Sequence, residues 1–177
     1  MRRLKLSLDS YLRRKPVYLE KPLREVGFVD DVIIDPKVGV LAVVSHGSRW
    51  GTWAFPYMHT QIANDRIIAE EHSKQSPRVF LSEGCFYQEM LGGKVIGPDG
   101  EILGRIKDIE LVDLPTGEIA YRVSPPGLTG LWRPTFSVHA STEVVAESSR
   151  NIVLRVNVNA PIMAERAKAN DVPRVQV

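Results

Sequence analysis

Cysteine is nearly absent from this sequence, in which Cys85 is the single cysteine among 177 residues. An intrachain disulfide is therefore excluded, and so is a metal site built from several thiolates of one chain. No evident neighbour of Cys85 would stabilise a thiolate, so we expect a buried and inert side chain. This low cysteine usage fits a reducing compartment.

Long apolar runs are also missing. No stretch approaches the roughly 18 apolar residues of a membrane-spanning helix. The amino-terminal residues Met1 to Asp9 lack a hydrophobic signal core. We therefore expect a cytoplasmic protein without a transmembrane segment, for which peripheral association with a membrane is an alternative.

The usual catalytic motifs are lacking as well. The sequence contains no Gly-x-Gly-x-x-Gly, no Gly-x-x-x-x-Gly-Lys-Ser/Thr, no His-Glu-x-x-His and no Gly-x-Ser-x-Gly. No two of its histidines have the spacing of a metal-binding pair on one helix or strand, and a structural or surface role is expected for all four: His46, His59, His72 and His139. We therefore predict that the chain is not an enzyme and has no catalytic residue, no cofactor and no metal site.

What is present is the composition of a folded protein, with 44% hydrophobic and 25% charged residues. The net charge is only +2, but residues 1–27 alone carry +5. Arg2, Arg3, Arg13 and Arg14 are part of this basic segment. It could attract phosphate, an anionic membrane surface or an acidic partner, and the alternative is a solvated basic edge.

One pattern appears twice, at residues 27–45 and again at residues 104–124. In both copies a glycine opens an apolar strand, an Asp and a Pro begin a turn, a second glycine ends it, and another apolar strand returns. The apolar positions Val29 and Val32, like Ile106 and Ile109, are three residues apart. Because strand side chains alternate with a period of two, this spacing predicts one extra residue, a β-bulge, in each copy.

Acidic residues gather on both predicted hairpins. They are Asp30, Asp31 and Asp35 in the first copy and Asp108, Glu110 and Asp113 in the second. Calcium needs several oxygen ligands from one compact loop, whereas these residues are spread along strands. We therefore expect a solvated acidic face.

Residues 92–109, around the start of the second copy, read GGKVIGPDGEILGRIKDI, and PTGEI follows at residues 115–119. This stretch resembles the PRC-barrel family, which includes the cytoplasmic domain of the photosynthetic reaction centre H subunit and a domain of the ribosome-maturation factor RimM. Residues 15–27, KPVYLEKPLREVG, are a weaker match in the first copy. The two matches together extend over roughly residues 8–70 and 88–158.

The resemblance implies a mainly β fold of two small PRC-type β-barrels in tandem, each with a short helical turn. We predict a first domain at residues 1–72, a linker at 73–81, a second domain at 82–160 and a tail at 161–177 that forms a short helix or is loose. The family motif brings no catalytic residues with it.

Three residues of the first copy indicate a contact surface. Val40, Ala42 and Val44 are apolar where the second copy has Glu118, Ala120 and Arg122. Since contiguous exposed apolar surface is uncommon, we expect this face to contact the second repeat or another subunit. The glycine-rich loops after the hairpins hold all the tryptophan, namely Trp50, Trp53 and Trp132. Of these, Trp53 and Trp132 are expected to pack on their own barrels, and Trp50 and Trp132 to serve as partner anchors if exposed.

These observations predict a non-enzymatic adaptor that docks onto a larger protein assembly. The family resemblance implies electron-transfer or photosynthetic complexes or the cell-division machinery. A homodimer is expected, because small barrels have strand edges that need covering. The alternative is an RNA-associated or ribosome-associated maturation factor, supported by the basic segment together with Tyr11 and Tyr18.

Overall fold

The computed structural model describes residues 6–126, 134–148 and 151–154. Strands dominate this part of the chain, so the prediction of a mainly β fold is confirmed. The first half contains, in chain order, β1 (Leu6–Ser7), α1 (Leu8–Leu12), β2 (Pro16–Leu19), β3 (Arg24–Asp35), β4 (Gly39–Gly47), β5 (Gly51–Pro56), the 3-10 helix η1 (Tyr57–His59), β6 (Thr60–Ile62) and β7 (Ile67–Ala69).

Two further 3-10 helices, η2 (Glu71–Ser73) and η3 (Pro77–Ser82), connect this half to the next. The second half then contains β8 (Cys85–Phe86), α2 (Tyr87–Met90), β9 (Lys94–Ile96), β10 (Ile102–Asp113), β11 (Glu118–Ser124), β12 (Phe136–His139), α3 (Ala140–Glu143), β13 (Val144–Ser148) and β14 (Asn151–Leu154).

The pairing of the strands is duplicated. In the first half β3 pairs with β4 and β4 with β5, while β2 lies antiparallel to β3 and parallel to β7. In the second half β10 pairs with β11 and β11 with β12, while β9 lies antiparallel to β10 and parallel to β14. The repeated hairpin is therefore confirmed, whereas the division into two barrel domains at the expected boundaries stays a prediction.

Both predicted β-bulges are present. The register between β3 and β4 shifts between Val29 and Asp31, and the register between β10 and β11 shifts between Ile106 and Asp108. Each aspartate accepts a hydrogen bond from the next backbone amide, over 2.7 Å for Asp31 and 2.8 Å for Asp108. The short polar side chain thus binds the local backbone where the ladder is interrupted.

The two hairpin turns meet each other. The Val40 amide donates to the Gly117 carbonyl over 2.9 Å, and a Cβ added to Gly39 would lie 2.3 Å from that same oxygen, so no side chain fits there. Two tyrosines reinforce the contact in a reciprocal way. Tyr57 donates to the Leu114 carbonyl at 2.6 Å and Tyr121 donates to the Pro36 carbonyl at 2.8 Å, so each repeat binds the turn of the other.

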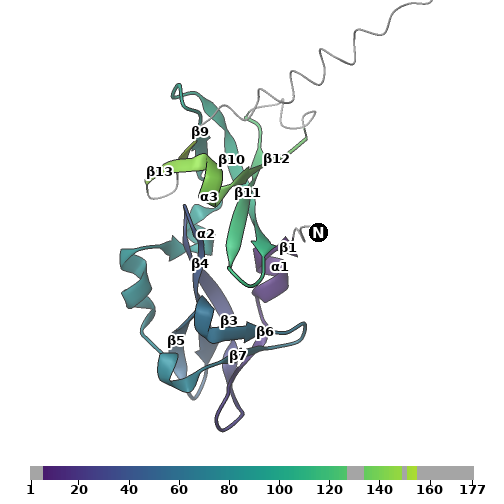
Figure 1. Cartoon of the computed structure of the whole chain (residues 1–177), viewed down its shortest axis with the longest axis vertical. Coiled ribbons are helices and arrows are strands. Elements are labelled where there is room, and N and C mark those ends of the chain that lie inside the picture. Colours follow the sequence, from purple (N-terminus) through teal and green to yellow (C-terminus); the bar gives the residue numbers. More distant parts are fainter. Residues whose placement is uncertain (1–5, 127–133, 149–150, 155–177) are drawn as a thin grey trace, which may run out of the picture.

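The leading segments of the two repeats are exchanged. Strand β1 of the first half pairs with β10 of the second, and β8 of the second half pairs with β3 of the first. Helices α1 and α2 follow these strands and pack on β10 and β3 respectively. Figure 1 shows both helices near the middle of the long axis, close to where the β3–β4 hairpin meets the β10–β11 hairpin. Residues 6–12 therefore form a strand and a helix that pack on the sheet of the other repeat.

Apolar side chains of both repeats form one large buried cluster. It includes Leu8 and Leu12 from α1, Val29 and Val43 from the first hairpin, and Ile109 and Tyr121 from the second. Burial of such side chains is the main stabilising contribution in a small domain, and here the two repeats share it. Among the described residues, we find no helix with the length and apolar character to cross a membrane.

Candidate docking surface

The predicted contact face of β4 is buried inside the chain. Val40 lies at the junction with Gly117, while Ala42 and Val44 pack in a smaller cluster with Ile33 and Ala54. Phe80 of η3 and Phe86 of β8 are packed against this cluster. The residues that cover the face therefore come from the expected linker and from the leading strand of the second repeat.

The tryptophans differ in exposure. Trp53 is half-buried against the large cluster and donates its indole N–H to the Trp50 carbonyl. Trp50 itself is 40% exposed, and the Arg24 guanidinium carbon lies 4.7 Å from the centre of its ring. Trp132, Arg2 and Arg3 lie outside the described residues.

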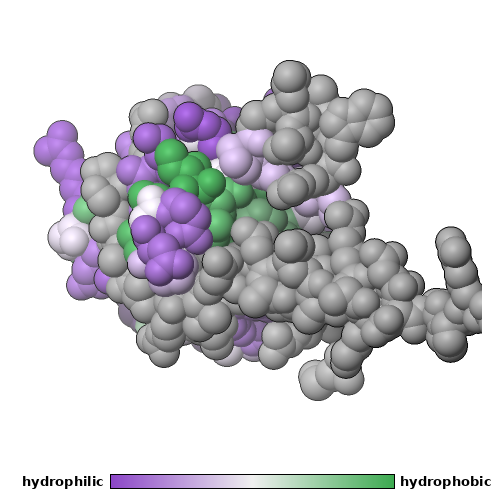
Figure 2. Space-filling model, turned by 90° about the horizontal axis from the view of Figure 1, so that it is seen from above, coloured by the Kyte–Doolittle hydropathy of each residue, from purple (hydrophilic) through white to green (hydrophobic). Residues whose placement is uncertain are grey.

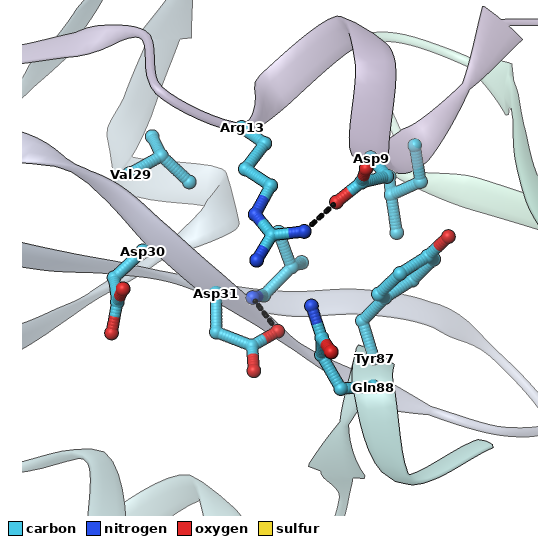
Figure 3. A pocket seen from close by; sticks show the side chains of 9 residues that line it. Asp9, Arg13, Val29, Asp30, Asp31, Tyr87 and Gln88 are labelled. Carbon is cyan, nitrogen blue, oxygen red and sulfur yellow. Dashed lines mark hydrogen bonds and ion pairs between the residues drawn. The ribbon is translucent and has the colours of Figure 1, made fainter. Parts of the chain in front are cut away.

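Arg13 points into a narrow depression between α1, α2 and β3, shown in Figure 3. Its guanidinium is 3.1 Å from the Asp9 carboxylate, one turn back on α1. Asp31 lies on the opposite wall of this depression, beside Gln88 of α2. Arg13 thus forms an ion pair with Asp9 of its own helix, while its side chain stays 45% exposed.

Burial raises the pKa of Asp31 above its ordinary value, and the neighbouring carboxylates of Asp30 and Glu89 raise it further. The hydrogen bond from the Val32 amide and the positive charge of Arg13 act in the opposite direction. Asp31 is half-buried, so it does not belong to a fully solvated acidic face as expected.

The expectation of a solvated acidic face is wrong for Asp108 and Glu110, which are both buried. Arg122 on the adjacent strand lies 3.3 Å from Asp108 and 3.9 Å from Glu110. Asp108 also accepts hydrogen bonds from the Ser7 hydroxyl and the Tyr87 hydroxyl, each at 3.1 Å. A buried carboxylate needs such partners, and here they come from both exchanged segments.

The aromatic residues that were candidates for stacking already have cations on their rings. The Lys15 ammonium lies 3.8 Å from the centre of the Tyr11 ring, and Arg66 lies over the Tyr18 ring at 6.0 Å. Lys15 also donates to the Ala63 carbonyl at 2.8 Å, and partial burial lowers its pKa. The basic segment is therefore tied to the first repeat through these side chains.

The first repeat nevertheless presents an open depression on β3 and β4 that we call the Phe28 surface. It is defined by Arg14, Phe28, Asp30 and His46. The Phe28 side chain is 51% exposed, opposite His46 in the β3–β4 ladder. Asp30 and Arg14 are exposed, and the His46 Nδ1 is held 2.8 Å from the Thr52 hydroxyl. An exposed aromatic ring flanked by charged and polar groups is typical of a contact surface.

Sequence reasoning singled out Arg14 but missed Phe28. The residue stands between Gly27 and Val29, which are both buried, and immediately before the bulge. Because the bulge shifts the alternation of faces, simple periodicity does not show which side Phe28 occupies. Among the described residues, Arg14 makes no ion pair, unlike Arg13 and Arg24.

A second apolar area is visible from the end of the molecule near β9, where apolar residues gather between polar ones (Figure 2). Ile102, at the start of β10, is one of the larger exposed apolar residues of the chain. The Phe28 surface is formed by other elements and is independent of this area.

Comparison with known proteins gives little further information. No family model matches the sequence, and no curated protein matches it. Among solved structures, a candidate 16S ribosomal RNA processing protein, RimM, from Pseudomonas aeruginosa is similar over 84% of this chain and 98% of that chain, with a TM-score of 0.34 and 11% sequence identity. A similarity at this level carries no argument about this chain, so its membership of the PRC-barrel family stays a prediction.

Proposed function

We propose that the protein is a non-enzymatic adaptor that docks onto a protein partner through the Phe28 surface. The observation that carries this proposal is the half-exposed Phe28 ring on the same surface as Arg14, which makes no ion pair within residues 6–126, 134–148 and 151–154. Aromatic and arginine side chains are the residues that most often contribute strongly to protein interfaces. The partner we expect inserts an apolar side chain against Phe28 and places a carboxylate against Arg14.

The scaffold supports this proposal because it holds the surface rigidly. Phe28 lies in the ladder between β2 and β4, paired with Pro16 on one side and His46 on the other. A side chain on a paired strand loses little further backbone freedom when a partner binds. The Phe28 backbone is therefore fixed before a partner binds, and about half of the residue is exposed for contact.

RNA binding is the second candidate, because an exposed ring beside a guanidinium also suits stacking of a base and contact with a phosphate. Asp30, whose carboxylate lies on the same surface, repels a phosphate and a partner carboxylate alike and so does not distinguish the two candidates. A homodimer is a variant of the adaptor hypothesis in which the partner bound at the Phe28 surface is a second copy of this chain. The type of assembly, photosynthetic, electron-transfer or cell-division, follows from the family resemblance alone.

Affinity capture from the source cells tests the proposal. Wild type is compared with Phe28→Lys, which removes the ring, and with Val38→Lys, which changes a 62% exposed apolar residue in the β3–β4 turn. We expect a defined protein that is recovered in stoichiometric amount with wild type and Val38→Lys and is lost with Phe28→Lys. Equal recovery with all three proteins would contradict the proposal, and recovery of RNA alone would favour the second candidate.

A further inference from the structure

Three potential metal ligands of the first repeat converge, although His59 is 11 and 13 positions before the other two, Glu70 and His72. The Glu70 Oε2 atom lies 2.7 Å from the His59 Nδ1 atom and 3.2 Å from the His72 Nε2 atom. One ligand atom from each residue lies within 4.8 Å of the other two. The two imidazole rings are edge to face, with centres 6.2 Å apart. Both rings therefore converge on one carboxylate oxygen.

The backbone fixes this convergence. Thr60 pairs with Ala69 in the β6–β7 hairpin, and the Glu70 amide continues the ladder by donating to the His59 carbonyl at 3.2 Å. The η2 turn then returns His72 to the same side. Ser73, which is buried, holds this turn by donating its hydroxyl to the Glu70 carbonyl at 2.7 Å. The backbone positions of the three residues are therefore set before any ion binds.

We propose that His59, Glu70 and His72 bind a divalent transition metal ion of the Zn²⁺ type. Two imidazole nitrogens and one carboxylate oxygen form a donor set that zinc accepts, with a fourth position left for water or another ligand. In a tetrahedral zinc site with bonds of about 2.0–2.1 Å, ligand atoms are about 3.3 Å apart. The 3.2 Å between Glu70 and His72 is close to this separation, whereas the 2.7 Å between Glu70 and His59 is a hydrogen-bond distance that lengthens when an ion binds.

Small side-chain rotations complete the geometry. The His72 side chain is 81% exposed and the His59 side chain 41% exposed, so neither ring is locked by packing. Glu20 lines the same depression as His59 and Glu70, and its carboxylate lies 3.9 Å from the Lys21 ammonium. Glu71, another nearby carboxylate, is engaged by Arg24. The Glu70 carboxylate, which faces the two imidazoles, therefore provides the negative charge that favours a cation.

Isothermal titration of the full chain with zinc chloride, in protein prepared without a histidine tag, tests this site. Wild type is compared with His72→Ala, Glu70→Gln and the control His139→Ala, which changes a histidine of β12 in the second repeat. We expect one zinc ion per chain for wild type and His139→Ala. Affinity should be at least roughly tenfold weaker for His72→Ala and Glu70→Gln, since each loses a direct ligand.

A second readout separates coordination from a change in stability. Cobalt(II) bound by imidazole and carboxylate absorbs visible light, and this absorption should appear with wild type and be displaced by zinc. His72 is too exposed for His72→Ala to unfold the chain, which circular dichroism would check. Equal zinc affinity of wild type and His72→Ala, or no stoichiometric binding to wild type, would overturn the proposal and leave a cluster held by hydrogen bonds alone.

Discussion

Ser7 in the first repeat donates a hydrogen bond to the carboxylate of Asp108 in the second, over 3.1 Å and across 101 positions of sequence. The same carboxylate accepts a hydrogen bond from the Tyr87 hydroxyl. Tyr87 directly follows β8, the strand of the second repeat that pairs with β3 of the first. Asp108 therefore ties together both exchanged segments and the bulge of β10. The two repeats are interlocked by polar contacts as well as by a shared apolar core.

Replacing Asp108 with Ala is expected to destabilise the fold strongly. The change leaves Arg122 without its nearer carboxylate and leaves two hydroxyl donors unpaired. Removing one partner of a buried ion pair costs about 3–5 kcal/mol. Arg122 is 39% exposed, so solvent screening reduces the expected loss to about 2–3 kcal/mol in urea unfolding. Asp30→Ala, at an exposed position, is the control, and an equal loss for both variants would contradict the role of Asp108.

Arg14 and Gly92 occupy equivalent positions in the two repeats. The Arg14 amide bonds to the Val29 carbonyl at 3.0 Å and the Gly92 amide to the Ile106 carbonyl at 2.8 Å, and both residues have positive φ, of 64° and 77°. This backbone conformation costs a non-glycine residue about 1–2 kcal/mol. Arg14→Gly removes this cost, but it also raises the conformational entropy of the unfolded chain, which offsets part of the gain. We therefore expect the free energy of unfolding to rise by about 0.5–1 kcal/mol.

The reverse change, Gly92→Ala, should lose about 1 kcal/mol, because the added Cβ meets open space and only the backbone conformation is penalised. Thermal unfolding of the two variants measures both effects. A loss of stability with Arg14→Gly would show that the Arg14 side chain makes a stabilising contact that outweighs its backbone conformation.

The buried Asp31 predicts a dependence of stability on pH. Its pKa is raised in the folded protein by burial and returns to the ordinary value of 3.8 on unfolding. The folded state therefore binds the proton more tightly, and the favourable contribution of protonated Asp31 is lost as pH rises through the raised pKa. Asp31→Asn cannot ionise, so its stability relative to wild type should increase from about pH 3.5 upward and become constant above the folded pKa. A difference in urea midpoint that is the same from about pH 3.5 to pH 7 would contradict this.

The duplicated hairpin could be predicted because its signals are local. The spacing of Val29 and Val32, matched by Ile106 and Ile109, revealed each bulge, and an Asp, a Pro and a Gly marked each turn. The exchange of β1 and β8 could not be predicted. These strands are two residues long and have no periodicity of their own, and their pairing partners depend on the packing of α1 and α2.

Side-chain environments were harder to predict than elements. The apolar character of Val40, Ala42 and Val44 correctly indicated a covered face, but Phe80 and Phe86, which cover it, lie in segments expected to be linker and domain start. From the sequence alone, a carboxylate such as Asp108 is expected to be exposed, because the side chains that bond to it, Ser7 and Tyr87, are distant in the sequence. His59 and His72 are 13 positions apart and meet through the β6–β7 hairpin, so their spacing resembles no metal-binding pair within one element.

The docking role of the Phe28 surface is tested most directly by photo-crosslinking in the source cells. A photoreactive phenylalanine analogue is placed at position 28 and, as the control, at position 38, where Val38 is an exposed apolar residue on the turn. The proposal predicts that position 28 yields a discrete protein adduct, that position 38 does not, and that Arg14→Glu weakens the adduct. The same adducts from both positions, or no protein adduct from position 28, would contradict it.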